Sequence, residues 1–156
     1  MIQIAIMMGS KSDMSIMEES AKILKDFEVS YEIKVLSAHR TPKETAAYAE
    51  NFRENGGKAF ICGAGMSAAL SGVVAAHTTL PVIGVPIDAS SFNGLDALLS
   101  TVQMPPGVPV GAVAVGKAGA KNAALLVLRI LSLSDESIKE KLEKFSEEQK
   151  QKILNP

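Results

Sequence analysis

Short apolar runs alternate along this chain with longer stretches in which apolar residues recur at helical spacing. The apolar runs have the length and the β-branched content of buried strands. They are Ile2–Met7, Tyr31–Leu36, Ala59–Cys62, Val82–Val85 and Ala112–Val115. The amphipathic stretches are Asp13–Phe27, Pro42–Asn55, Ser67–His77, Leu95–Gln103, Lys117–Leu133 and Glu136–Leu154. Strands that alternate with helices in this way favour a parallel sheet covered by helices on both faces.

The pattern therefore predicts an α/β fold. We expect a three-layer α/β/α sandwich around a doubly wound, parallel, five-stranded sheet of flavodoxin-like order. No repeat or linker interrupts the pattern, so residues 1–156 are expected to form a single domain. One helix start is signalled with particular clarity, because Thr41 and Glu44 have the spacing of a capping box, with Pro42 at the first helical position.

The last amphipathic stretch is highly charged. Within this helix, residues 135–154, the apolar side chains Ile138, Leu142 and Phe145 recur on one side. Such a helix either lies on its own domain or reaches onto a neighbouring subunit, and we expect the second arrangement. The very apolar segment 108–133 supports an oligomer, since part of it is suited to contact with another copy; the alternative is that it only fills the core.

Composition and charge narrow the possible functions. Of the 156 residues, 47% are hydrophobic and 21% are charged, and the net charge is −1 with the basic residues spread along the chain. Nucleic acids and membrane surfaces both require a concentrated positive face, so we expect neither as a partner. The chain opens without a basic leader and has no apolar run of membrane-spanning length, which favours a cytoplasmic location. The single cysteine, Cys62, is interpreted as a buried core thiol.

Three of the expected strands are followed by segments suited to ligands, at the edge where open α/β sheets bind them. After the first strand, Gly9 permits a tight turn, and Ser10 and Ser12 offer hydroxyl groups near the free N–H groups of a helix start. Asp13 would repel a phosphate but suits the hydroxyl groups of a ribose. The alternative is that Ser12 or Asp13 only caps the helix.

The second segment contains one of only two histidines in the chain. Ser37, Ala38, His39 and Arg40 directly follow the second strand. Histidine can gain and lose a proton near neutral pH, and arginine can hold an anion bidentately. We therefore interpret His39 as a catalytic residue rather than a loop-stabilising one. The other histidine, His77, is expected at a helix end away from these segments and is interpreted as structural.

The third segment is rich in small residues. We expect it to bind substrate through Gly63, Ala64, Gly65, Met66, Ser67, Ala68 and Leu70. Together the three segments predict one crevice for a phosphorylated ribose compound. No cluster of His, Cys, Asp and Glu has the spacing of a metal site, so no metal is expected. Neither a P-loop nor a nucleophile elbow is present.

Five short motifs carry a resemblance to a known family. They are Met8-Gly9-Ser10-Lys11-Ser12-Asp13, Ser37-Ala38-His39-Arg40-Thr41-Pro42, Gly63-Ala64-Gly65, Gln103-Met104-Pro105 and Pro109-Val110-Gly111. With these motifs the chain resembles the 5-(carboxyamino)imidazole ribonucleotide mutase family of purine biosynthesis, which is related to the aminoimidazole ribonucleotide carboxylases. The first two motifs, at this spacing, are the most specific part of the resemblance.

The resemblance implies a homo-octamer with active sites at subunit junctions, and an isomerase that uses no cofactor. The implied reaction moves the carboxylate of 5-(carboxyamino)imidazole ribonucleotide from the exocyclic nitrogen to a ring carbon, giving 4-carboxy-5-aminoimidazole ribonucleotide. Ser10 and Arg40 are implied to hold the 5′-phosphate and Asp13 the ribose, while His39 shuttles the proton. An imidazole suits this chemistry, since one group protonates the nitrogen and later removes the ring-carbon proton. Backbone N–H groups of segment 63–69 would approach the carboxylate closely.

The third segment departs from the usual Gly-Ala-Gly-Gly-Ala-Ala-His-Leu-Pro-Gly of these mutases. Met66, Ser67 and Ser71 differ from it, and Ala69 stands where the histidine is usual. The run ending at Gly72 looks more like related enzymes that carboxylate aminoimidazole ribonucleotide directly with carbon dioxide. A direct carboxylase is therefore kept as an alternative function. A non-catalytic, nucleotide-binding module of flavodoxin-like fold is a second alternative.

Overall fold

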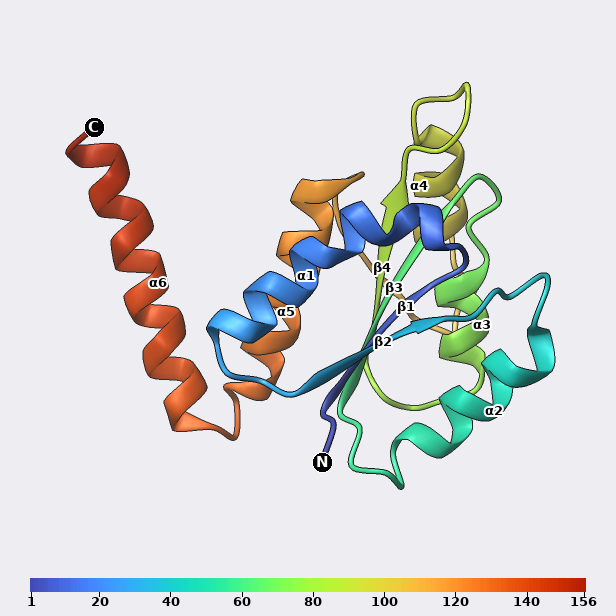
Figure 1. Ribbon diagram of the computed structural model, residues 1–156, viewed down its shortest axis with the longest axis horizontal. Helices are drawn as coiled ribbons and strands as arrows, with labels where there is room; N and C mark the ends of the chain where they lie inside the picture. The colour runs from blue at the N-terminus through green and yellow to red at the C-terminus, as the bar shows by residue number, and fades with distance from the viewer.

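The computed structural model describes residues 1–156 and confirms the predicted α/β fold (Figure 1). The strands are β1 (Ile4–Met8), β2 (Tyr31–Val35), β3 (Ala59–Gly65), β4 (Val82–Ile87) and β5 (Gly111–Ala112). All are parallel, in the flavodoxin-like order β2-β1-β3-β4-β5. The helices are a 3₁₀ turn η1 (Lys11–Asp13), α1 (Met14–Asp26), α2 (Pro42–Phe52), α3 (Leu70–Ala76), α4 (Leu95–Val102), α5 (Lys117–Leu131) and α6 (Glu136–Leu154).

The sheet separates two layers of helices. Helices α1 and α5 lie together on one face, and α2, α3 and α4 cover the other (Figure 1). All five residues of β1 are fully buried, because successive side chains of this central strand enter opposite cores. Ile6 packs in the larger core beneath α1 and α5, whereas Met7 packs beside Phe52 and Phe60 in the smaller one. Both faces of the strand are therefore apolar, as a doubly wound sheet requires.

The bounds of β1, β2 and β4 differ from the sequence predictions by one or two residues, and those of β3 and β5 differ for reasons that the structure shows. The third strand continues to Gly65 instead of ending at Cys62, because it pairs with β4 as far as Ile87. The fifth strand has only two residues, Gly111–Ala112, and not the predicted Ala112–Val115. Pro86 of β4 has no N–H group to donate toward β5. Its carbonyl oxygen accepts from the N–H of Gly116, which lies beyond the end of β5. The hydrogen-bond ladder between β4 and β5 therefore stops.

The start of α3 and the capping of α2 also differ. The third helix begins at Leu70 rather than Ser67, because residues after β3 form short turns before the helix. Pro42 does occupy the first turn of α2, but the predicted capping box is wrong in its bonding. The Thr41 hydroxyl accepts from the N–H of Ser37 at 2.8 Å and donates to the Ser37 carbonyl at 3.1 Å. It thus ties the preceding loop together instead of capping the helix.

Part of the apolar segment 108–133 fills the core of this chain, whereas Leu126 and Leu133 are exposed. Ala120, Ala124 and Leu128 of α5 are fully buried against the sheet and α1. The first turns of α6 join this core: Ile138 is buried, and the rings of Phe145 and Phe27 meet edge to face with centroids 5.9 Å apart.

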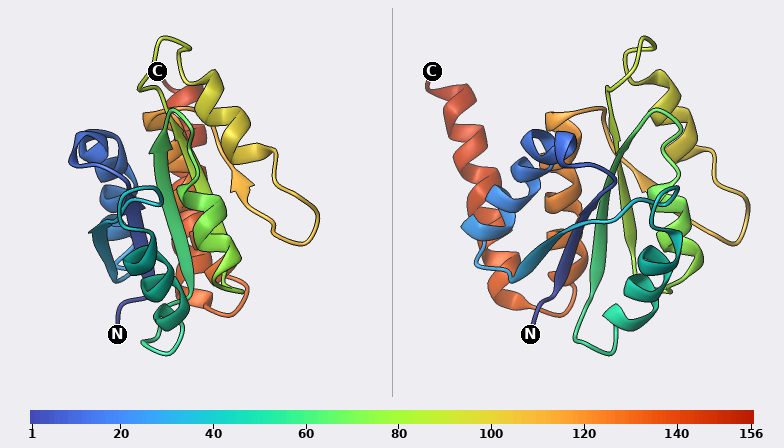
Figure 2. Two further views of the ribbon diagram at one scale, coloured as in Figure 1. Left: turned by 90° about the vertical axis from the view of Figure 1, so that its right-hand side faces the viewer. Right: turned by 45° about the vertical axis from the view of Figure 1, so that its right-hand side comes forward.

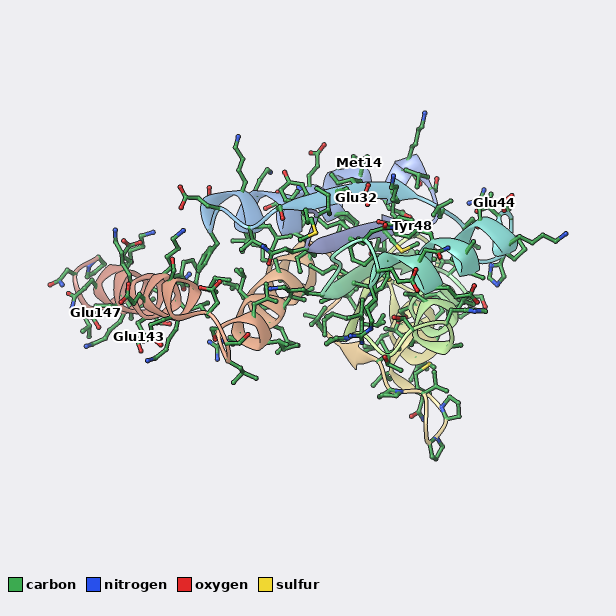
Figure 3. All side chains as sticks on the ribbon, turned by 90° about the horizontal axis from the view of Figure 1, so that it is seen from below. Met14, Glu32, Glu44, Tyr48, Glu143 and Glu147 are labelled. Atoms are coloured by element: carbon green, nitrogen blue, oxygen red, sulfur yellow. The ribbon has the colours of Figure 1, made fainter.

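Beyond Phe145 every residue of α6 is exposed. The end of the helix stands apart from the sheet in Figure 1 and in the right-hand view of Figure 2. The side chains of this free half are mostly polar or charged, and Glu147 at its start is labelled in Figure 3. None of the helices combines the length and apolar character needed to cross a membrane.

The start of α5 approaches the end of β5 so closely that only glycine fits there. A Cβ atom built on Gly119 would lie 1.6 Å from the carbonyl oxygen of Ala114, whereas one built on Gly9 meets no atom within 4 Å. We predict that Gly119→Ala lowers the free energy of unfolding by about 2–4 kcal/mol, because backbone must move to relieve the overlap.

Denaturant unfolding followed by circular dichroism measures this effect. Gly9→Ala is the matched control and should unfold close to the wild type, since Gly9 is not in the left-handed region. Equal stability of the Gly119→Ala variant and the wild type would contradict the close approach.

Candidate active site

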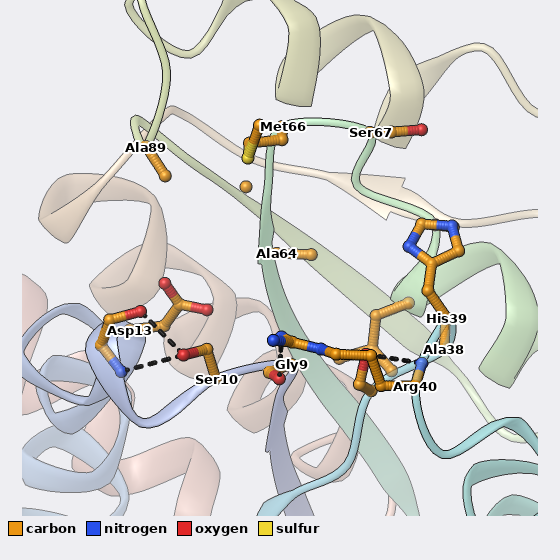
Figure 4. A pocket seen from close by; sticks show the side chains of 15 residues that line it. Gly9, Ser10, Asp13, Ala38, His39, Arg40, Ala64, Met66, Ser67 and Ala89 are labelled. Atoms are coloured by element: carbon orange, nitrogen blue, oxygen red, sulfur yellow. Dashed lines mark hydrogen bonds between the residues drawn. The ribbon is translucent and has the colours of Figure 1, made fainter.

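The register of the sheet brings the three predicted segments together. Met8 of β1 is paired with Val35 on one side and with Gly63 on the other. The segments that follow these three strands therefore lie along one edge of the sheet. The neighbouring strands β1 and β3 are followed by α1 and α3, which lie on opposite faces of the sheet, and such a switch point is where ligands bind in open α/β sheets. A pocket of about 320 Å³ lies there (Figure 4).

Thirteen of the fifteen predicted site residues line this pocket. The complete lining is Gly9, Ser10, Ser12, Asp13, Ser37, Ala38, His39, Arg40, Ala64, Gly65, Met66, Ser67, Ala69, Leu70 and Ala89. Gly63 and Ala68 lie outside it: Gly63 sits within β3, where the Met17 thioether fills the space beside it, and Ala68 is buried. Sequence reasoning missed Ala69 and Ala89. Ala89 follows β4, and the carboxyl end of that strand was the signal available for it.

In the segment after β1 the hydroxyl groups of two serines lie close together. Ser10 Oγ accepts from the N–H of Ser12 at 3.3 Å and from Ser12 Oγ at 2.9 Å. It thereby caps η1, whereas Asp13 makes no capping hydrogen bond to α1. The carboxylate of Asp13 is thus not used to cap a helix, and only 8% of the residue's surface is exposed. Burial raises the pKa of Asp13 above its ordinary value of 3.8, against the opposing effects of the Ser12 hydroxyl and the Arg40 charge.

The segment after β2 fixes the only cationic group that lines the pocket. Arg40 Nη2 donates to the carbonyl oxygen of Gly9 at 3.0 Å, and its backbone N–H donates to Ser37 Oγ at 3.1 Å. Ser37 is itself buried, and its carbonyl accepts from the hydroxyl groups of Thr41 and Thr45. The guanidinium therefore spans from the second segment to the first, with further N–H groups left for an anion.

His39 lies beside Arg40 on the wall of the same pocket. Its side chain is exposed and its ring makes no hydrogen bond to the rest of the chain. Both ring nitrogens are consequently open to a ligand. The neighbouring residue Ala38 is small, so nothing bulky separates the imidazole from the cavity.

The segment after β3 builds a wall of a different character. Ala64, Gly65 and Ala69 contribute little more than backbone and methyl groups, whereas Met66 and Leu70 add long apolar side chains and Ser67 a hydroxyl group. In the view of Figure 4, Met66 and Ala64 lie across the pocket from Ser10 and Arg40. The pocket thus has a polar, cationic end and an apolar end.

The other residues singled out in the sequence lie elsewhere. His77 is outside the pocket, with Nδ1 2.9 Å from Glu50 Oε1 at the surface, in keeping with the structural role expected for it. Cys62 is buried as expected, and burial raises the pKa of its thiol. No group of three His, Cys, Asp or Glu side chains lies close enough to hold a metal ion.

This arrangement suits a phosphorylated, polar molecule with a reactive group at the apolar end. The guanidinium and the hydroxyl groups match a phosphate, and the carboxylate of Asp13 matches hydroxyl donors. The imidazole of His39, on the wall of the same pocket, supplies a proton donor and acceptor. The geometry therefore combines anion binding with acid–base chemistry in one cavity.

Comparison with known proteins gives a consistent result. The family model described as AIR carboxylase matches residues 3–152. A protein of Pyrococcus abyssi is 56% identical over 150 residues, 96% of this chain and 85% of that protein. One of Saccharolobus solfataricus is 50% identical, with 99% of this chain and 97% of the other covered, and one of Bacillus subtilis is 52% identical, with 97% and 93% covered. All three are named N5-carboxyaminoimidazole ribonucleotide mutase.

The same likeness is found in three dimensions. The crystal structure of Treponema denticola PurE superimposes with a TM-score of 0.89 at 35% sequence identity, covering 99% of this chain and 95% of the other. The sheet order, the site at its carboxyl edge and the match along nearly the whole sequence agree, and this chain belongs to the AIR carboxylase family.

Proposed function

We propose that this protein is an N5-carboxyaminoimidazole ribonucleotide mutase. It converts 5-(carboxyamino)imidazole ribonucleotide to 4-carboxy-5-aminoimidazole ribonucleotide in purine biosynthesis, in the cytoplasm and without a cofactor. The observation that carries the proposal is the presence of His39 and Arg40 in one pocket with the Gly9–Asp13 segment. The names of the relatives at 50% identity and above support the same activity.

The polar end of the pocket binds the ribose phosphate. Arg40 and Ser10 hold the 5′-phosphate, with the hydroxyl of Ser12 close by. The contact between Arg40 and the Gly9 carbonyl supports this role, because it fixes the guanidinium before the ligand arrives. Asp13 accepts from ribose hydroxyl groups, since its carboxylate lines the pocket and is not used to cap α1.

The imidazole of His39 carries out both proton transfers. In its protonated form it donates to the exocyclic nitrogen while the C–N bond to the carboxylate breaks, which releases carbon dioxide. The ring carbon then attacks carbon dioxide, and the neutral imidazole removes the proton from that carbon. The proton taken up in the second step replaces the one given in the first, so the histidine ends as it began.

Direct carboxylation of aminoimidazole ribonucleotide is the second candidate, because of the sequence Ala69-Leu70-Ser71-Gly72. Only Ala69 and Leu70 of this run line the pocket. Ser71 is buried and packs toward Gly84 of β4, where a Cβ atom would lie 3.0 Å from its hydroxyl oxygen. The serine therefore fits helix packing better than substrate selection, which favours the mutase.

The protein assembles as a homo-octamer in this proposal, with α6 packed on a neighbouring subunit. The free half of α6 supports such a contact. A second surface is the row of Leu95, Leu99 and Val102 on α4, whose side chains are 55%, 50% and 47% exposed. Their spacing places them on one face of the helix, where another copy would cover them.

Replacing the proposed acid–base residue tests the function. We predict that His39→Asn lowers turnover of 5-(carboxyamino)imidazole ribonucleotide by at least about 10²-fold, because the pocket has no second imidazole and Asp13 is engaged with the ribose in this proposal. Binding of the ribonucleotide should be nearly unchanged. Product formation is measured by absorbance without ATP or added bicarbonate, and binding by calorimetry.

His77→Asn is the matched control and should keep wild-type turnover, since that histidine lies outside the pocket. A His39→Asn variant with substantial activity would exclude the proposed proton shuttle. If the wild type instead requires aminoimidazole ribonucleotide and bicarbonate as substrates, the protein is a direct carboxylase.

The buried carboxylate gives a second, pH-dependent prediction. Because burial raises the pKa of Asp13 in the folded chain, folding favours the protonated carboxyl group. As the pH rises through the folded pKa the group loses this proton, and the folded state becomes less stable. We predict that Asp13→Asn raises the melting temperature at pH 7, and that this gain shrinks as the pH falls toward 3.8. The same variant should have a higher KM, since ribose hydroxyl groups lose a charged acceptor.

Thermal unfolding between pH 4 and pH 8 measures the first effect, and steady-state kinetics the second. A variant that is less stable than the wild type at pH 7 would show that the carboxylate supports the fold, contrary to the prediction.

The assembly is tested by the mass of the particle. We predict a species eight times the 16.4 kDa chain in analytical ultracentrifugation. Leu99→Asp should shift it toward smaller species, because a charge at a covered apolar position is costly to bury. Ser100→Asp places the same charge on α4 outside the apolar row and serves as control. If both variants dissociate, or if neither does, a contact through this row is contradicted.

A further inference from the structure

One residue of the pocket has a backbone conformation that its side chain disfavours. Met66 has φ = 55°, in the left-handed region where a Cβ atom crowds the following carbonyl oxygen. Two other non-glycine residues, Glu28 and Asn93, share this conformation, but neither lines the pocket. Glycine would adopt it freely, so the methionine is held there at a cost in stability.

Core packing does not explain the methionine. Its side chain is 60% exposed and belongs to neither hydrophobic core, unlike Met7, Met8 and Met17, which are fully buried. The turn itself is held by backbone contacts: the N–H of Ala68 donates to the Met66 carbonyl at 2.9 Å. The backbone would make the same contact with glycine, and what Met66 adds is an apolar side chain at the rim of the pocket.

The surroundings of Met66 indicate what this side chain covers. Ala64, Gly65 and Ala89 line the pocket next to it, and no charged residue of the lining lies in this segment. Figure 4 shows Met66 above Ala64, between Ala89 and Ser67. The floor at this end is therefore made of small groups, with one long, unbranched and adaptable side chain above it.

In the proposed reaction only one species is small, neutral and apolar. Carbon dioxide is detached from both nitrogen and carbon between the two steps, and it carries no charge that Arg40 could hold. It therefore stays at the reacting carbon only where the walls block its escape. An apolar cover over an apolar end of the pocket meets this need.

We infer that Met66 covers the carbon dioxide end of the pocket and so keeps the released molecule at the ring carbon until the new bond forms. This inference rests on the proposed mutase function. It assigns Met66 a role in fidelity, which is the fraction of carbon dioxide returned to the same substrate molecule. Met66 takes no part in proton transfer or in bond formation in this inference.

The test is Met66→Gly, assayed with 5-(carboxyamino)imidazole ribonucleotide in ¹³C-bicarbonate and carbonic anhydrase. The wild type should return its own carbon dioxide and give mostly unlabelled product. The variant should release about tenfold more free aminoimidazole ribonucleotide per turnover and incorporate label into the product, read by mass spectrometry. Its melting temperature should equal or exceed that of the wild type, because glycine relieves the backbone.

Two control variants separate cover from strain. Met66→Leu keeps the apolar side chain and should retain most of the wild-type exclusion of label. Glu28→Gly relieves the same backbone conformation far from the pocket and should leave label exclusion unchanged. These controls show whether leakage follows the loss of the side chain or the change in the backbone.

The outcomes distinguish this inference from the function on which it rests. If the wild type forms no product from the carboxyamino substrate, the mutase function fails before any variant is considered. If the wild type is active but Met66→Gly excludes label equally well, Met66 is not the cover. Free exchange of label in the wild type would likewise overturn the inference.

Discussion

The parallel register of β1 with both of its neighbours is the constraint on which this site depends. Met8 pairs with Val35 and with Gly63, so the chain leaves three adjacent strands along one edge. The strands themselves are held by two apolar cores, one on each face of β1. Residues that are about thirty positions apart in sequence thus meet in one cavity, and the hydrogen bond from Arg40 to the Gly9 carbonyl joins two of the segments directly.

Much of the fold could be predicted from the chain because its pattern is strongly periodic. Five apolar runs and six amphipathic stretches gave the element order, and the flavodoxin-like strand order was correct. The errors arose where tertiary contacts override local signals. Pairing with β4 draws Gly63 and Gly65 into a strand that looks like a loop in sequence, and Pro86 shortens the neighbouring β5 ladder. Thr41 bonds to the loop before it, a choice that the capping pattern alone cannot reveal.

The candidate site was predictable to the extent that its residues are chemically distinctive. His39, Arg40, Ser10 and Asp13 drew attention by type and by position after a strand, and all four line the pocket. Alanines carry no such signal, so Ala69 and Ala89 were missed and Ala68, which is buried, was included. The burial of Asp13 and the left-handed backbone of Met66 were equally hidden, since both depend on the packed chain.

The rigid and adaptable parts of the pocket are unequal, and this matters for inhibitor design. The guanidinium of Arg40 already donates from Nη2 to the Gly9 carbonyl and from Nε to Ser37 Oγ, so a phosphate mimic at that end would lose little affinity to ordering of the protein. Met66 is exposed and unbranched, and a compound reaching the opposite end would have to select one of its rotamers. Selectivity between members of the family is therefore best sought at the thioether, and potency at the guanidinium.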